Sequence, residues 1–214
     1  NDGFPFMACS DVTVCGGTPG RLFRISFSGE LAYEVAVPAR YGDALIREIM
    51  AAGEEFDITP YGTEALGVMR IEKGHVTGAE LNGQMTAFNV NMNNMISQKK
   101  DSIGSVLSRR EVMVADDQVR LVGVKTVEKS DNLSSGAHFL AKNGTPITKN
   151  DQGWITSVCY SPHFEQHIGL GFLERGHERH GEIIRAWDGV RGTDILVEIV
   201  SPHMYDPEGG LQRG

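Results

Sequence analysis

Residues 24–38 read RISFSGELAYEVAVP, and this stretch predicts how the first part of the chain folds. Apolar and polar residues alternate up to Phe27, and Ser28-Gly29-Glu30 then supplies a turn, so residues 21–37 are expected to form a β-hairpin. Side chains alternate between the two sides of a strand. The second strand therefore places Glu34 between Ala32 and Ala36 on one face, with the other face formed by Leu31, Tyr33, Val35 and Val37.

The surroundings of Glu34 favour a binding role. Alanine is an unusual neighbour on an exposed strand face, where threonine, lysine or arginine is common, and it leaves room for a flat ligand. A carboxylate offers two acceptor oxygens, which match a planar group with two adjacent N–H donors, such as the edge of a pterin ring. The alternative is an ordinary solvated carboxylate on an edge strand.

The rest of the chain predicts an α+β protein with two domains. Helical spacing predicts a helix over residues 40–52 that ends at Gly53 in a left-handed conformation, and a second helix from Thr59-Pro60 to Gly74. The asparagine-rich segment 81–97 is expected to be a loop. Six short β-rich runs then follow, which are typical of a small closed barrel or a sandwich. The expected domains are residues 1–115, an antiparallel sheet with helices, and residues 116–214, a small β-barrel.

Composition limits the classes of partner. The chain has 214 residues, of which 40% are hydrophobic, and its net charge of −8 disfavours nucleic acid, although Lys99, Lys100, Arg109 and Arg110 could form a local basic patch. No apolar run is long enough to span a bilayer, and no secretory signal is expected. The three cysteines lack metal-binding spacing and favour a reducing cytoplasm. His163 and His167 are expected in a loop between strands, so we predict no metal site.

Several motifs carry a resemblance to a known family. They are GELAYE (29–34), YGTEALGVMRIEKG (61–74), GAELNGQMT (78–86), MISQKKDSIG (95–104) and SPHMYDPEGG (201–210). Together they resemble the folate-binding aminomethyltransferase superfamily, which includes the glycine-cleavage T-protein, dimethylglycine dehydrogenase and heterotetrameric sarcosine oxidase. With FPFM at 4–7 and YDPEG at 205–209, the chain is most similar to the C-terminal part of sarcosine oxidase alpha subunits.

The resemblance implies a fold and a set of binding residues. The first domain would be part of a folate-binding domain, and the second an aminomethyltransferase C-terminal barrel. Glu34 would bind the pterin and Phe27 would lie against its ring, with His75 and Tyr205 as further cofactor-binding residues. Relatives hold the folate tail with an arginine where this chain has Leu66. The family's catalytic aspartate is expected upstream, so no catalytic residue is assigned here.

The same resemblance implies the reaction and the partners. The whole protein would demethylate sarcosine oxidatively as an oxidoreductase acting on CH–NH donors. This segment would bind tetrahydrofolate and capture the one-carbon unit as 5,10-methylenetetrahydrofolate. FAD, FMN and NAD are expected only in the full complex with the other sarcosine oxidase subunits, and the segment alone is expected to be inactive. The alternatives are a non-catalytic interaction module of the same fold and a T-protein-like aminomethyltransferase.

Overall fold

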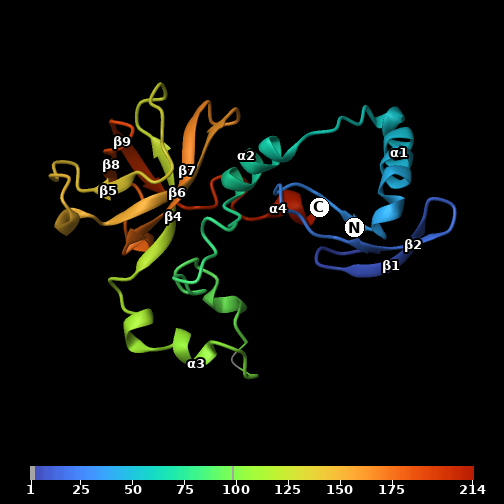
Figure 1. The fold of residues 1–214 in the computed structure, drawn as a ribbon, viewed down its shortest axis with the longest axis horizontal. Coiled ribbons are helices and arrows are strands. Elements are labelled where there is room, and N and C mark those ends of the chain that lie inside the picture. Colours follow the sequence, from blue (N-terminus) through green and yellow to red (C-terminus); the bar gives the residue numbers. More distant parts are fainter. Residues whose placement is uncertain (1–2, 98) are drawn as a thin grey trace. The chain divides into compact units, whose positions relative to one another are not determined.

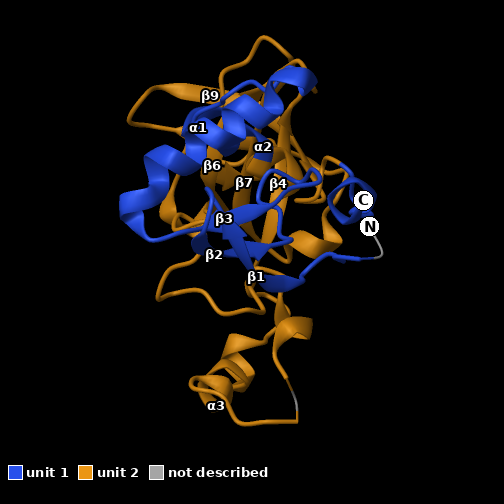
Figure 2. Cartoon of the chain, turned by 90° about the vertical axis from the view of Figure 1, so that its right-hand side faces the viewer, with its two compact units in different colours: residues 1–69, 206–214 blue, residues 70–205 orange. Residues whose placement is uncertain are grey.

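The computed structural model describes residues 3–97 and 99–214, which form two compact units (Figures 1 and 2). Unit 1 comprises residues 1–69 and 206–214, and unit 2 comprises residues 70–205. The boundary between the two units along the chain, after Met69, falls within the helix α2 (Thr63–Lys73). The domain boundary expected after residue 115 stays a prediction, because the units group residues by contact and not by family domain. Within the described residues, no helix combines the length and the apolar composition that a membrane crossing requires.

Unit 1 is built on a three-stranded antiparallel sheet in the order β1-β2-β3. Its strands are β1 (Cys9–Val14), β2 (Thr18–Phe23) and β3 (Glu34–Ala36), followed by α1 (Gly42–Gly53) and, from the end of the chain, α4 (Gly210–Arg213). Short 3-10 turns lie at Ala39–Tyr41 and Glu54–Phe56. The sequence did not predict β1, although Cys15, Gly16 and Gly17 form its turn into β2 with positive φ values. The sheet therefore has one more strand than the expected hairpin.

The predicted hairpin is present, but its connection is longer than expected. β2 ends at Phe23, which pairs with Glu34 at the start of β3, so residues 24–33 lie outside the ladder. The reason is the buried side chain of Arg24. Its guanidinium donates hydrogen bonds to the carbonyls of Ala32 at 3.2 Å and Gln212 at 3.1 Å, and to a third carbonyl, that of Arg213, at 3.2 Å. These bonds link the connecting segment at Ala32 to the C-terminal residues Gln212 and Arg213.

Two helix boundaries differ in part from the prediction. Gly53 adopts φ −86°, and the left-handed residue is Asp57 with φ 55°. Gly53 is the last residue of α1, so the predicted end of the helix is confirmed, but its conformation is right-handed and not left-handed. A β-carbon at Gly53 would lie 2.6 Å from the side chain of Ile58, so this glycine permits a close approach. α2 begins at Thr63, because the Thr59 hydroxyl donates to the carbonyl of Asp57 at 3.3 Å and does not cap a helix.

Unit 2 contains the six predicted strands, closed into a barrel in the order β4-β7-β6-β5-β8-β9. The closed barrel is confirmed, and the sandwich is excluded for this part of the chain. The strands are β4 (Val119–Thr126), β5 (His138–Leu140), β6 (Gly153–Ser161), β7 (Gln166–Glu174), β8 (Ile183–Asp188) and β9 (Thr193–Val200). In the described part of the segment before the barrel, the helical elements are short: Asn93–Met95, α3 (Ser105–Ser108) and Glu111–Met113. Further 3-10 turns lie at Thr148–Asn150 and Gly176–Glu178.

The hydrophobic core lies on both sides of the barrel wall. One buried cluster fills the interior and includes Val122, Phe139 and Ile199. A second cluster lies on the outer side of β7, where Phe172 packs with Ile71 of α2 and other residues. Because β7 is covered on both faces, its sequence is an almost continuous apolar run. This second cluster attaches the end of α2 to the barrel.

Candidate functional site

Glu34 lies at the start of β3 on an exposed face of the sheet in unit 1. The register pairs Glu34 with Phe23 and Ala36 with Arg21, so these four side chains share one face. Glu34 and Ala36 are both exposed. A hollow of about 350 Å³ lies along this face and is lined in part by Phe23, Arg21 and Ala36. There is open space on the Ala36 side of the carboxylate, whereas Ala32 lies outside the three-residue strand.

The segment that leads into β3 is held by side-chain contacts. The Ser26 hydroxyl accepts a hydrogen bond from the Gly29 backbone N–H at 3.0 Å. Phe27 follows in this segment with 37% of its surface exposed. The Arg24 guanidinium lies 5.1 Å from the centre of the Tyr33 ring, directly before Glu34. Arg24 and Tyr33 therefore fix the approach of the chain to the candidate carboxylate.

His75 and Tyr205 belong to unit 2, at the C-terminal end of α2. Gly74 adopts φ 79°, its N–H donates to the carbonyl of Ile71, and the N–H of His75 donates to the carbonyl of Arg70, which is the hydrogen-bond pattern of a Schellman motif. The backbone N–H of Tyr205 donates to the carbonyl of Glu72 at 2.9 Å. Both predicted residues thus lie next to the same helix end.

The predicted residues therefore form two pairs, one in each unit. Glu34 and Phe27 lie in unit 1, and His75 and Tyr205 lie in unit 2. Their assembly into one cofactor site stays a prediction.

A buried polar network near the end of α2 was not predicted as a unit. Arg70 Nη1 donates to Glu80 Oε2 at 3.2 Å, and Arg70 Nη2 donates to the Ser157 hydroxyl at 2.7 Å. The Ser157 and Thr156 hydroxyls donate to Glu80 Oε1 at 2.6 and 2.5 Å, and the Thr77 N–H donates to Glu80 Oε2 at 2.8 Å. Arg70 and Glu80 each lie in one of the family motifs, but no local sequence pattern connects them to a serine on β6.

The electrostatics of this network keep Glu80 ionised. The side chain of Glu80 is completely buried. Burial raises the pKa of Glu80, but the hydrogen bonds from Ser157, Thr156 and Thr77 and the charge of Arg70 outweigh it, and the pKa lies below its ordinary value. The network therefore holds a paired carboxylate inside unit 2 and anchors the segment that follows α2 to the barrel.

Nucleophilic and metal chemistry find little support among the described residues. Burial, reinforced by the charge of Glu72, raises the pKa of the Cys159 thiol to about 12, which leaves it protonated at neutral pH. His163 lies in the turn between β6 and β7, and His167 lies in β7. Over residues 3–97 and 99–214, no three histidine, cysteine or carboxylate side chains gather as metal ligands would.

Comparison with known proteins identifies both halves of the chain. The model of the GCVT N-terminal domain matches residues 1–100, and the model of the glycine cleavage T-protein C-terminal barrel domain matches residues 120–206. The sarcosine oxidase alpha subunit of Rhizobium meliloti (strain 1021) is 42% identical over 207 residues, which are 96% of this chain and 21% of that subunit. The corresponding subunit of Corynebacterium sp. (strain U-96) is 38% identical over 100% of this chain and 22% of that subunit.

One solved structure shows the fold. The glycine cleavage system aminomethyltransferase T from Bartonella henselae matches with a TM-score of 0.80 and 17% identity, over 97% of this chain and 54% of that chain. The chain spans about a fifth of the length of the sarcosine oxidase alpha subunits that it matches. The α+β fold with a C-terminal barrel is confirmed by this match and by the two family models.

Proposed function

Because this chain belongs to the glycine cleavage T-protein family, we propose that it is the tetrahydrofolate-binding part of a sarcosine oxidase alpha subunit. Sarcosine would be demethylated oxidatively by the whole protein, with flavin and the other subunits outside this segment. The one-carbon unit would be captured here on folate as 5,10-methylenetetrahydrofolate. The location would be the cytoplasm, which fits the three cysteines, all free in the structure.

The observation that carries the proposal is the exposed carboxylate of Glu34 beside an open hollow. Two acceptor oxygens suit the ring amide and the exocyclic amine of a pterin, and such bidentate, charge-assisted hydrogen bonds are among the stronger ones. Phe23 and Ala36 share the face of Glu34, so a flat ring can approach the carboxylate over an apolar surface. In this proposal Phe27 lies against the ring, and His75 and Tyr205 complete the site.

The contribution of this chain would be binding and positioning. Holding a folate nitrogen next to the incoming one-carbon unit turns a bimolecular capture into a local step, which can supply a large share of a reaction barrier. None of the four candidate residues is assigned a proton-transfer role. The predicted consequence is that losing the site changes the fate of the one-carbon unit and leaves sarcosine oxidation itself intact.

A calorimetric titration with tetrahydrofolate tests the proposal on the complete gene product. Glu34→Gln keeps the shape of the side chain but replaces one acceptor oxygen with a donor, and should weaken folate binding by about 1.5–3 kcal/mol. Glu198→Gln is the matched control, because Glu198 is an exposed glutamate on β9. Unchanged affinity in Glu34→Gln would refute the role of this carboxylate, and no folate binding by the parent protein would refute the function.

A product assay separates the proposed function from its two alternatives. With sarcosine and tetrahydrofolate, the parent should form methylenetetrahydrofolate, whereas Glu34→Gln should release more free formaldehyde at an unchanged rate of sarcosine oxidation. A protein without any sarcosine oxidation that still transfers one-carbon units would instead be a T-protein-like aminomethyltransferase. A protein with neither activity and no folate binding would be an interaction module.

A further inference from the structure

Arg110 lines a pocket of unit 2, and its side chain has no partner among the described residues. Several arginines pair with carboxylates at short range, as Arg185 does with Asp194 at 2.5 Å and Arg179 with Glu182 at 2.6 Å. Across the described residues, the Arg110 side chain makes no hydrogen bond or ion pair. The protein as a whole carries a net charge of −8, and Arg110 places a positive charge in the lining of a pocket.

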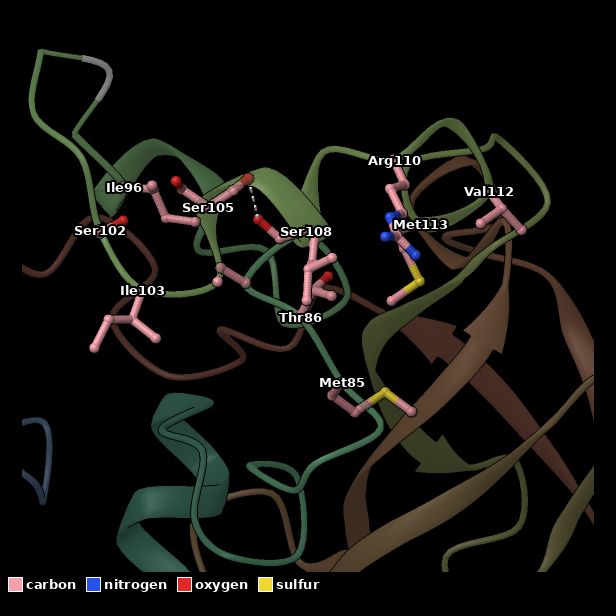
Figure 3. A pocket seen from close by; sticks show the side chains of 13 residues that line it. Met85, Thr86, Ile96, Ser102, Ile103, Ser105, Ser108, Arg110, Val112 and Met113 are labelled. Carbon is pink, nitrogen blue, oxygen red and sulfur yellow. Dashed lines mark hydrogen bonds between the residues drawn. The ribbon is translucent and has the colours of Figure 1, made fainter.

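The pocket next to Arg110 has the size and lining of a small-molecule site. Its volume is about 500 Å³, within the range of about 300–1,000 Å³ that is usual for ligand sites. Figure 3 shows side chains from separate segments around it: one contains Met85 and Thr86, and another runs from Ser102 to Met113. The lining is mostly apolar, and it is completed by Ile96, Ile103, Leu107 and Val112.

Part of this apolar lining is exposed to solvent in the structure. The surface of Ile103 is fully exposed, and that of Leu107 is 56% exposed. Apolar side chains that border a pocket gain free energy when an apolar ligand removes them from water. The nearby Ser108 hydroxyl donates to the carbonyl of Ser105 at 3.1 Å. Among the described residues that line the pocket, Arg110 is the one with a charged side chain.

We propose that this pocket binds a small anionic amphiphile, a carboxylate with an aliphatic chain. The guanidinium of Arg110 binds the carboxylate, for which its planar pair of donors is suited. The aliphatic chain packs along Met85, Leu107 and Met113. A purely polar anion such as inorganic phosphate leaves the apolar walls in water, and a neutral hydrocarbon leaves Arg110 without its anion. This site is independent of the proposed folate function and lies entirely within unit 2.

The test uses octanoate as the probe and methionine methyl groups as the reporters. In protein labelled with ¹³C at the methionine methyls, octanoate should shift the signals of Met85 and Met113, and leave Met204, which does not line the pocket, unchanged. Shortening the probe should weaken binding by up to about fourfold for each methylene removed. Arg110→Gln should weaken octanoate binding by about tenfold or more, and binding of the uncharged octanol should stay the same.

Arg109→Gln is the matched control. Arg109 is the neighbouring exposed arginine, but it lines a different hollow of about 170 Å³. Its loss should change octanoate affinity by no more than about twofold, since an exposed charge that makes no direct contact with the ligand contributes little. The proposal is overturned if octanoate gives no saturable shift at Met85 and Met113 below its micelle-forming concentration. It is equally overturned if the two arginine variants weaken binding to the same extent, because the effect would then be diffuse electrostatics.

Discussion

Replacing Glu80 with glutamine should destabilise unit 2 strongly, although the change alters one atom. In the parent, Glu80 accepts hydrogen bonds from Thr77, Thr156 and Ser157 and pairs with Arg70. The glutamine keeps one acceptor oxygen, and its amide can turn toward the two hydroxyls, which can rotate to accept a hydrogen bond. What cannot be recovered is the negative charge opposite the guanidinium, whose side chain is only 11% exposed.

The expected cost follows from this burial. Removing one partner of a buried ion pair costs about 3–5 kcal/mol, because the other charge stays buried without compensation. The amide retains some hydrogen bonds, so the lower end, about 3 kcal/mol, is expected for Glu80→Gln. Adding Arg70→Met removes the uncompensated charge, so the double variant should lose less than the sum of the single losses, with a coupling of about 1–3 kcal/mol.

The dependence on pH provides a second check. The pKa of Glu80 in the folded protein lies below its ordinary value of 4.5. A carboxyl whose pKa is lowered by folding stabilises the protein fully above its unfolded pKa, and this stabilisation is lost as the pH falls through the lower folded pKa. The gap in stability between the parent and Glu80→Gln should therefore be constant near neutral pH and shrink in strong acid.

Urea unfolding followed by tryptophan fluorescence measures this loss. Trp154 lies on β6 and Trp187 on β8, so both tryptophans report on the barrel. Glu198→Gln, on the exposed side of β9, is the control and should change the free energy of unfolding by less than about 0.5 kcal/mol. If Glu80→Gln lowers the free energy of unfolding no more than this control does, the reasoning is refuted. The buried network would then contribute no more to stability than a surface carboxylate.

Three further outcomes are expected. Gly74→Ala should destabilise unit 2 by about 1–3 kcal/mol in the same urea assay, because φ is 79° and the new β-carbon would clash with the carbonyl oxygen of Pro202; an unchanged midpoint would contradict this. Cys9 is exposed and should react with iodoacetamide at pH 8, whereas Cys159, with its pKa raised to about 12, should react only after unfolding, as mass spectrometry of the peptides can show. Arg24→Met should release residues 24–33 and speed their amide exchange, and equal exchange in parent and variant would exclude the anchoring role.

The sequence alone determined the features that depend on local patterning. Alternation and glycine spacing predicted all six barrel strands, and helical spacing predicted α1 and α2 with Gly74 after the second helix. These predictions succeeded because a helix or strand with one buried face requires apolar residues at regular intervals, and this spacing is visible in the sequence. Alternation likewise predicted that Glu34 and Ala36 share one face of their strand. The family could be recognised from motifs, since these occur in a fixed order along the whole chain.

Tertiary structure decided the features that depend on residues far apart in the sequence. β3 is three residues long because Arg24 binds carbonyls at the other end of the chain. Gly53 ends α1 in a right-handed conformation, and Ile58 packs against it. Glu80 becomes a paired, buried carboxylate only when Ser157 comes within 2.6 Å of it, across 77 residues of chain. Such contacts depend on three-dimensional packing and on the need of buried polar groups for hydrogen-bond partners, so they cannot be predicted from a local sequence pattern.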